Sequence, residues 1–423
     1  MFLLCLTLAT QVIRHIGTAM TDSSHPRFRP TGQTPRTPHP WMAVACGGLA
    51  TFAIVTTEML PVGLLTSIAD TVGASTGTAG LLLTVPALLA ALFAPLVVVA
   101  AGNIDRRHIL SALFVLLIAA NLASALAPSM GWLLASRVLV GLCMGGIWAI
   151  AGTLAVRLVP AASVGLATSI IFGGVAAASV LGVPLGALIG DLAGWRMAFG
   201  SMAMLAAVVL GLHLWSMPPL PVGQSVSVRA LRDALSNQGL RLGLIMTMLL
   251  VAGHFMAFTF VRPWLLSVSG FHPEWIGAVL FAYGTAGIVG NFIAGINAAR
   301  RAGWTLIVIA AGLATTLLLL FWASGGAWAG ALVLVLWGLA YGGVSVSVMT
   351  WTMKAAPKAL EPATAWSVTA FNSAIAAGSF MGGNVVDRYG LHTNVLAACG
   401  LLLVALGVAV AIQYRYVRPG AFA

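Results

Sequence analysis

The stretch IVTTEMLPVGLL, residues 54–65, places one glutamate inside a long apolar run that begins near Trp41. The run holds no other acidic or basic side chain before Asp70, and it is long enough to cross a bilayer as a helix, which needs about 20 residues. A carboxylate at that depth costs about 2.5–3.5 kcal/mol on insertion scales. Glu58 therefore either has a function or is a protonated carboxyl that bonds to Thr56 or to a neighbouring helix.

The composition of the whole chain assigns it to a membrane. Of its 423 residues, 60% are hydrophobic and 7% are charged, whereas soluble proteins carry about 25% charged residues. No soluble fold could bury this much apolar surface. The four cysteines show no metal or disulfide spacing and are interpreted as packing residues: Cys5, Cys46, Cys143 and Cys399.

Twelve apolar segments along the chain each have about the length of a spanning helix. They predict an all-α integral membrane protein with twelve transmembrane helices in two pseudo-symmetric six-helix bundles. The predicted spans are 42–65, 77–101, 108–127, 132–156, 164–190, 196–217, 241–267, 275–298, 303–323, 327–353, 363–386 and 392–414. The predicted domains are a tail at 1–40, a bundle at 41–217, a central loop at 218–240 and a second bundle at 241–423.

Basic residues between the predicted spans gather on one side of the membrane. The opposite side holds only Arg196 and Arg388. By the positive-inside rule, we expect both termini and the central loop to be cytoplasmic, in a cell inner membrane. The net charge of +11 then orients the chain, and nucleic acid is not an expected partner. The clustered residues are Arg27, Arg29, Arg36, Arg106, Arg107, Arg157, Arg229, Arg232, Arg241, Arg300, Arg301, Lys354, Lys358, Arg415 and Arg418.

The N-terminal tail allows two start sites. Residues 1–19 are similar to a short signal segment, but no basic residues precede their apolar core. Met20 begins a polar stretch that is rich in proline and arginine and is expected to be disordered. Translation therefore begins at Met1 or at Met20.

The two predicted six-helix bundles contain similar segments at corresponding positions. The segment GNIDRRHIL (102–110) has a weaker counterpart in INAARRAGW (296–304), and Asp191 and Asp387 end corresponding spans. Such spacings indicate a duplicated six-helix unit, although chance similarity between apolar segments is the alternative. Duplicated halves are typical of secondary transporters, which bind their substrate between the repeats.

Three further segments carry motifs: SRVLVGLCMGGIWAIAG (136–152), FGGVAAASVLGVPLGALIGD (172–191) and LLVAGHFMAFTFVRPWLL (249–266). With these motifs, the chain from about Trp41 to Arg418 resembles the major facilitator superfamily. Within it, the chain is most similar to the twelve-helix drug:proton antiporters, the subgroup that includes purine-ribonucleoside, sugar and drug efflux pumps.

The resemblance implies a conformational latch in the segment 102–110, formed by Asp105, Arg106 and Arg107. This segment departs from the family pattern because no glycine separates the basic residues and because Asn103 stands where an apolar or small residue is usual. The alternative is that both arginines only anchor the segment to anionic lipid.

A glycine-proline bend in the fifth predicted span resembles the antiporter signature of the family. Its residues are Gly182, Pro184, Gly186 and Gly190, with Val183 between the first two where the family has them adjacent. Proline removes one helical hydrogen bond and bends the helix. The motif favours export by exchange over uptake.

In the family, the first, fourth, seventh and tenth helices line a central cavity. That placement implies a proton-coupling and substrate site, and for each residue the alternative is a packing role or, for Arg137, contact with the membrane interface. Pro61 and Gly63 are expected to loosen the helix after the glutamate. The candidate residues are Glu58, Arg137, His254, Trp351, Trp148, Asn291 and Asn372.

The predicted function is secondary active efflux. The sequence contains no nucleotide-binding G-x-x-x-x-G-K-[ST] motif, catalytic triad or metal cluster, so we expect no enzymatic activity, no cofactor and transport driven by the proton gradient. A monomer that exports a nucleoside-like molecule, a sugar or a drug is the favoured interpretation. The alternatives are a proton-coupled uptake symporter of the same fold and a membrane sensor that transports nothing.

Overall fold

A computed structural model describes residues 40–100, 104–160, 163–220, 228–322, 326–357 and 359–416. The tail 1–39, including Met20, and Asn103 lie outside the described residues. Within the described ranges, the regular structure is helical and contains no strand. The described residues form one compact unit.

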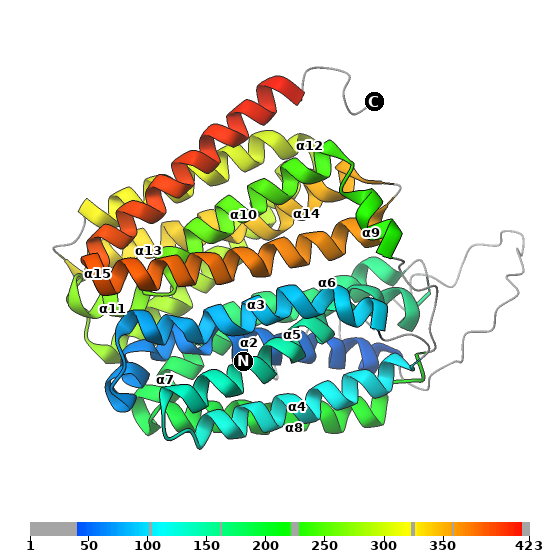
Figure 1. Ribbon diagram of the computed structural model, residues 1–423, viewed down its shortest axis with the longest axis horizontal. Coiled ribbons are helices and arrows are strands. Elements are labelled where there is room, and N and C mark those ends of the chain that lie inside the picture. Colours follow the sequence, from blue (N-terminus) through cyan, green and yellow to red (C-terminus); the bar gives the residue numbers. More distant parts are fainter. Residues whose placement is uncertain are drawn as a thin grey trace, which may run out of the picture. The chain divides into compact units, whose positions relative to one another are not determined.

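The first part of this unit is a set of helices, α2 to α8, that we call the N-terminal set (Figure 1). One of its spans is interrupted by a single π-helical turn, η2 (Ala178–Gly182). The α-helices are α2 (Pro40–Val72), α3 (Thr76–Ala100), α4 (Arg106–Ala125), α5 (Met130–Leu158), α6 (Val164–Ala177), α7 (Val183–Ala193) and α8 (Trp195–Ser216).

A second set of helices, α10 to α15, is the C-terminal set. The short helix α9 (Val228–Ala234) precedes it, inside the stretch that the sequence assigned to the central loop. The set comprises α10 (Gln238–Phe258), α11 (Val261–Ser267), α12 (Pro273–Trp322), α13 (Ala327–Gly342), α14 (Val344–Ala355) and α15 (Leu360–Tyr416).

The helix count is consistent with twelve membrane crossings. Among the described residues, ten helical segments are long and apolar enough to span a membrane, and the two longest, α12 and α15, each contain two predicted spans. One non-helical residue divides each of them, Arg301 in α12 and Gly390 in α15. Gly390 has φ 82°, a conformation that glycine adopts without a steric cost.

Three spans that the sequence presented as single helices are broken. The span at 164–190 contains η2, the span at 241–267 is split between α10 and α11, and the span at 327–353 is split at Gly343. In the second case, Pro263 has no N–H to donate to the carbonyl of Thr259, the residue that follows α10. The sequence signalled the first of these bends and missed the other two.

The two sets meet along α3 and α15, which lie side by side in Figure 1, and along η2, α7 and α12. Glycines permit this approach. A methyl group on Gly77 of α3 would overlap the carbonyl of Gly383 on α15, and one on Gly284 of α12 would lie 2.5 Å from the carbonyl of Ser179 in η2. Small residues of this kind let helix backbones approach closely in lipid.

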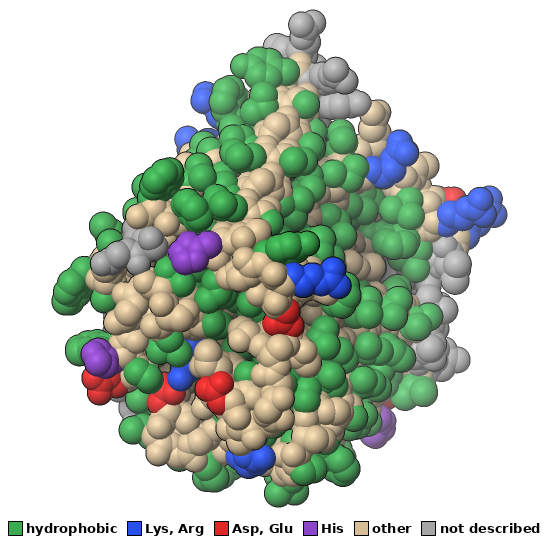
Figure 2. Space-filling model, turned by 60° about the vertical axis from the view of Figure 1, so that its left-hand side comes forward, with side chains coloured by type: hydrophobic (Ala, Val, Ile, Leu, Met, Phe, Trp, Pro, Cys, Tyr) green, Lys and Arg blue, Asp and Glu red, His purple; other side chains and the backbone are tan. Residues whose placement is uncertain are grey.

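We distinguish two ends of the described bundle. The Asp191 end contains α11, the end of α7 and the kink at Gly390, on the left of Figure 1; the Arg107 end contains the start of α4 and α9, on the right. Between the ends, apolar side chains near the middle of their helices, such as Val115 and Val404, are 56% and 55% exposed. Figure 2 shows hydrophobic side chains spread over much of one face, as expected for helices that contact lipid.

Candidate functional site

Glu58 lies in the buried middle of α2. Its side chain is 4% exposed, and its Oε1 atom has no hydrogen-bond partner among the described residues. Met59, the next residue, packs against the apolar cluster of the C-terminal set that Tyr341 also borders, and the Glu58 carboxylate acts electrostatically on the Tyr341 hydroxyl. Glu58 therefore lies where the two sets face each other, and one of its oxygens is available to a ligand or a proton.

Arg137 of α5 stabilises the α2 backbone next to Glu58. Pro61 cannot donate the helical hydrogen bond that the Thr57 carbonyl would otherwise accept. The Nη1 atom of Arg137 donates to this carbonyl at 3.0 Å. The helix remains continuous from Pro40 to Val72, so the expected loosening after Glu58 does not occur.

Arg137 and Glu58 do not form an ion pair in the part of the chain that the structure describes. The guanidinium lies 4.6 Å from the ring centroid of Phe199, and the side chain is fully buried. The suggested contact with the membrane interface is therefore wrong. Arg137 instead holds a backbone carbonyl one residue before the carboxylate, and its Nε and Nη2 atoms have no hydrogen-bond partner among the described residues.

The glycines of the antiporter-like bend seat the fifth span against α2. A methyl group on Gly182, Gly186 or Gly190 would overlap Thr56, Leu60 or Leu64, respectively. The three contacts follow one face of α2, at every fourth residue, on both sides of Glu58. The motif therefore fixes the distance between this span and the helix that carries the carboxylate.

The π turn η2 makes the bend. The N–H of Val183 bonds to the carbonyl of Ala178, five residues earlier, which accommodates Pro184 near the start of α7. This turn faces the C-terminal set, because Gly284 of α12 approaches Ser179 and Gly277 approaches the Pro184 carbonyl. The bend thus lies at the interface between the two sets.

His254 lies at the centre of an aromatic cluster in the C-terminal set. It is fully buried on α10, and its Nδ1 accepts a hydrogen bond of 3.1 Å from the Trp337 indole N–H. Because an indole nitrogen only donates, Nδ1 carries no proton and the neutral ring is the Nε2–H tautomer. Nε2 has no partner among the described residues.

Four rings of this cluster form a continuous stack. Tyr341 stacks on His254 with 3.4 Å between ring centroids, Phe258 stacks on His254 at 4.9 Å, and Tyr283 stacks on Phe258 at 4.8 Å. Trp337 meets three of these rings edge-on. Of this stack, only His254 was a predicted site residue.

The remaining predicted cavity residues lie in other surroundings. Trp148 of α5 is half-buried beside Phe172, with 6.0 Å between ring centroids. The indole of Trp351 donates to the Gly239 carbonyl at 2.9 Å, near the Arg107 end. Asn372 donates to Val368 of its own helix at 2.9 Å, and Asn291 is half-buried on α12.

The predicted latch residues tie the start of α4 to the end of α8. Asp105 accepts hydrogen bonds from the backbone N–H groups of Arg107 and Leu220, at 2.8 and 2.9 Å. Arg107 donates to the Leu214 carbonyl at 2.8 Å, and the backbone N–H of the buried Arg106 donates to the Leu220 carbonyl at 3.2 Å. All of these bonds lie at the Arg107 end.

The Asp191 end contains an ion pair that was not predicted. Arg262 of α11 bonds to Asp191 of α7 at 2.6 Å and is 3% exposed. The same guanidinium donates to the Gly63 carbonyl at 2.6 Å and to the Thr66 hydroxyl at 2.8 Å, both on α2. Because it bonds to both helices, Arg262 connects the C-terminal set to the N-terminal set.

Asp387, the sequence counterpart of Asp191, also bonds across the interface. Its carboxylate accepts from the Ser75 hydroxyl at 2.6 Å and from the Gly77 N–H at 2.8 Å, at the start of α3. The two corresponding carboxylates therefore each bind the opposite set, one through a guanidinium and the other through a helix N-terminus.

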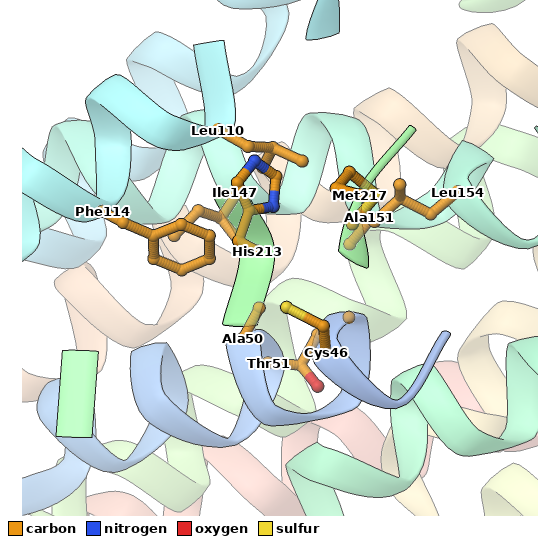
Figure 3. Close-up of a pocket in the computed structure, with 11 residues that line it drawn as sticks. Cys46, Ala50, Thr51, Leu110, Phe114, Ile147, Ala151, Leu154, His213 and Met217 are labelled. Carbon is orange, nitrogen blue, oxygen red and sulfur yellow. The ribbon is translucent and has the colours of Figure 1, made fainter. Parts of the chain in front are cut away.

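A small cavity lies elsewhere, within the N-terminal set (Figure 3). His213 of α8 points into it beside Phe114 of α4, and Cys46 and Thr51 of α2 lie opposite. The lining is mainly apolar, and His213 Nε2 is 3.1 Å from the Arg107 carbonyl. This cavity is separate from the Glu58 site, and no predicted site residue lines it.

The sequence matches the family described as Major Facilitator Superfamily over residues 47–364. The chain belongs to this superfamily. Its curated relatives include the purine ribonucleoside efflux pump NepI of Salmonella enteritidis PT4 (strain P125109), which is 33% identical over 375 residues that cover 88% of this chain and 94% of the relative. The protein of the same name from Salmonella paratyphi A (strain ATCC 9150 / SARB42) is 34% identical over the same shares.

Solved structures of major facilitator proteins share this fold. A bacterial homologue of the human lysosomal transporter Spinster, inward-facing and unoccupied, aligns with a TM-score of 0.72 at 15% identity, covering 90% of this chain and 98% of that chain. The human organic anion transporter MFSD10 (TETRAN) aligns with a TM-score of 0.64 at 18% identity, covering 88% and 100%. This major facilitator protein is thus a multi-pass membrane transporter of small molecules and not an enzyme.

Proposed function

We propose that this transporter exports a purine ribonucleoside or a related small polar molecule in exchange for protons, by alternating access. The observation that carries the proposal is Glu58, a buried carboxyl with an unpartnered oxygen between the two sets of helices. The similarity to purine ribonucleoside efflux pumps over 88% of the chain supports the substrate class and the direction of transport. Intramembrane carboxyls of this kind commonly serve proton relays.

Competition at one carboxyl would produce exchange. A deprotonated Glu58 can accept hydrogen bonds from the hydroxyl or N–H groups of a nucleoside, whereas a protonated one offers fewer acceptor sites. A proton that arrives from one side would therefore release the substrate, and a substrate that arrives from the other side would displace the proton. Arg137 would hold the α2 backbone in place during both steps through its bond to Thr57.

The basic side chains support an inner-membrane location with the Arg107 end in the cytoplasm. Arg106, Arg107, Arg300, Arg301 and Lys354 all lie at that end. Positive residues are retained on the cytoplasmic side during insertion. We propose on this basis that both termini are cytoplasmic, that a monomer is sufficient and that the proton gradient drives transport without a cofactor.

The test is transport into everted membrane vesicles under an imposed pH gradient. Labelled inosine and a cationic dye are offered separately to wild type and to Glu58→Gln. Glu274→Gln is the matched control, because it makes the same change at an exposed position at the start of α12. We expect gradient-driven accumulation of inosine in wild type and Glu274→Gln, and a loss of about tenfold or more in Glu58→Gln.

Each part of the proposal can fail separately. If wild type accumulates the dye and not inosine, the substrate class is wrong. If Glu58→Gln accumulates inosine as wild type does, the coupling carboxyl lies elsewhere. Gradient-driven uptake into whole cells, with none into everted vesicles, would establish the symporter. Exchange of labelled for unlabelled inosine without a gradient shows that Glu58→Gln remains folded and able to bind.

A further inference from the structure

We propose that Tyr341 is the ring on which the purine base of the substrate stacks, and that it determines the preference for purines. The proposal rests on the proposed export of a purine ribonucleoside and names the residue that would recognise the base. Tyr341 ends the four-ring stack in the C-terminal set and lies near Glu58 in the N-terminal set. One residue thus connects the aromatic cluster to the buried carboxylate.

Exposure distinguishes Tyr341 from the other rings of the stack. His254 is fully buried, and Phe258 and Tyr283 are 6% and 7% exposed. Tyr341 is half-buried, so it is the least buried ring of the four, and it lies at the end of the stack that a ligand between the two sets would meet first. A planar base placed on it would extend the stack by one layer.

The remaining rings hold Tyr341 in position. The hydrogen bond from Trp337 fixes the plane of His254, and Tyr341 lies on that plane with an angle of 11° between the rings. Glycines bring the supporting helices together, since a methyl group on Gly338 would overlap the Tyr283 carbonyl. A ring that is already fixed loses little conformational freedom when a ligand binds.

The polar edge of the proposed ligand fits the same place. Stacking alone accepts any base, because every base has a π-face, and a larger face stacks more strongly. The Glu58 carboxylate near the Tyr341 hydroxyl can accept a hydrogen bond from a purine N–H or a ribose hydroxyl. A planar apolar face beside a single acceptor suits a purine ribonucleoside better than a sugar, which has no planar ring.

The test compares KM values for inosine and uridine in everted vesicles that carry Tyr341→Leu or Tyr341→Phe. We expect Tyr341→Leu to raise the KM for inosine about tenfold and the KM for uridine less, because the purine loses the larger stacking contact. Tyr341→Phe keeps the ring and should leave both values within about threefold of wild type. Tyr283→Leu is the matched control, since it removes the same side chain from the buried end of the stack.

The outcomes separate this proposal from the proposed function. If wild type does not move inosine, both fall. If wild type moves inosine and Tyr341→Leu leaves the ratio of the two KM values unchanged, only the role of Tyr341 is wrong. An equal change of that ratio in Tyr283→Leu would mean that the cluster acts through packing and would overturn the proposal. If Tyr341→Leu does not insert, Tyr341→Met, which also removes the ring, takes its place in the same comparison. A tenfold rise of the inosine KM in Tyr341→Phe would assign recognition to the hydroxyl and would overturn the proposal.

Discussion

At the Asp191 end of the bundle, side chains of one set bond to the other set, whereas the hydrogen bonds that the structure describes for Arg107 and Lys354, at the Arg107 end, stay within a set. Arg262 of the C-terminal set forms an ion pair with Asp191 of the N-terminal set. Asp387 of the C-terminal set accepts a hydrogen bond from the N–H of Gly77, at the start of α3 in the N-terminal set. At the other end, Arg107 bonds to α8 within the N-terminal set, and Lys354 bonds to the carbonyl groups that end the first part of α12.

This difference has a consequence for transport by alternating access. Bonds between the sets must break and form again when one half of the transporter moves against the other. Bonds within a set can persist through the whole cycle. We therefore expect substitutions that remove bonds between the sets, at the Asp191 end, to shift the conformational equilibrium. Substitutions that remove bonds within one set, at the Arg107 end, should lower stability instead.

The largest effect is expected from Asp191→Asn. The substitution leaves the buried Arg262 without its charge partner, which disfavours the state that is closed at this end by about 2 kcal/mol, or about 30-fold in population. The check is the labelling of a cysteine placed at Ser67, half-buried near this end, by a membrane-impermeant maleimide in a chain without native cysteines. We expect labelling to be faster.

Asp70→Asn is the matched control for this experiment. Asp70 is exposed in the last turn of α2, at the Asp191 end of the bundle. Asp70→Asn therefore removes the same charge but leaves no buried arginine without its partner. Equal labelling rates in Asp191→Asn and wild type would show that the ion pair does not hold this end closed.

A smaller effect is expected from Asp387→Ala. The substitution removes two hydrogen bonds at the start of α3, to Ser75 and Gly77, and leaves no buried charge behind. Losing a cap of this kind costs about 1 kcal/mol, or about fivefold in population. The same maleimide assay measures it, and Asp387→Asn, whose amide oxygen still accepts, should recover most of the loss. A larger increase of the labelling rate in Asp387→Ala than in Asp191→Asn would contradict the expectation that an unpaired buried charge costs more than a lost hydrogen-bond cap.

The fold could be predicted from the sequence because apolar length alone requires spanning helices. The breaks within helices were harder to predict, because a break depends on whether another donor bonds to the carbonyl group that a proline leaves without a partner. Pro61 and Pro263 both remove a helical bond, yet α2 stays continuous where Arg137 supplies a replacement donor, and the seventh span breaks at Thr259. Only the positions of neighbouring helices decide between these outcomes.

The candidate site could be predicted in part. Glu58 was identifiable because a lone carboxyl in an apolar run is costly, and the sequence gives no neighbour that offsets it. Trp337 and Tyr341 are four residues apart, as are His254 and Phe258, and this spacing places each pair on one helix face. It could have signalled two ring pairs, but their stacking on each other depends on the contact between α10 and α13. The latch at Asp105, Arg106 and Arg107 stays a prediction.

The smallest effect is expected from Lys354→Gln. The ammonium donates to the carbonyl groups of Ala298 and Ala299 at 3.2 and 2.7 Å, in the same set and on the exposed surface. Its loss should lower stability by about 0.5 kcal/mol and the apparent melting temperature in detergent by about 1–2 °C, with maleimide labelling at Ser67→Cys unchanged. The exposed neighbour Arg300→Gln, the matched control, should change neither quantity. If Lys354→Gln accelerated labelling as much as Asp191→Asn, bonds within a set would also govern the conformational equilibrium, and the distinction between the two ends would be lost.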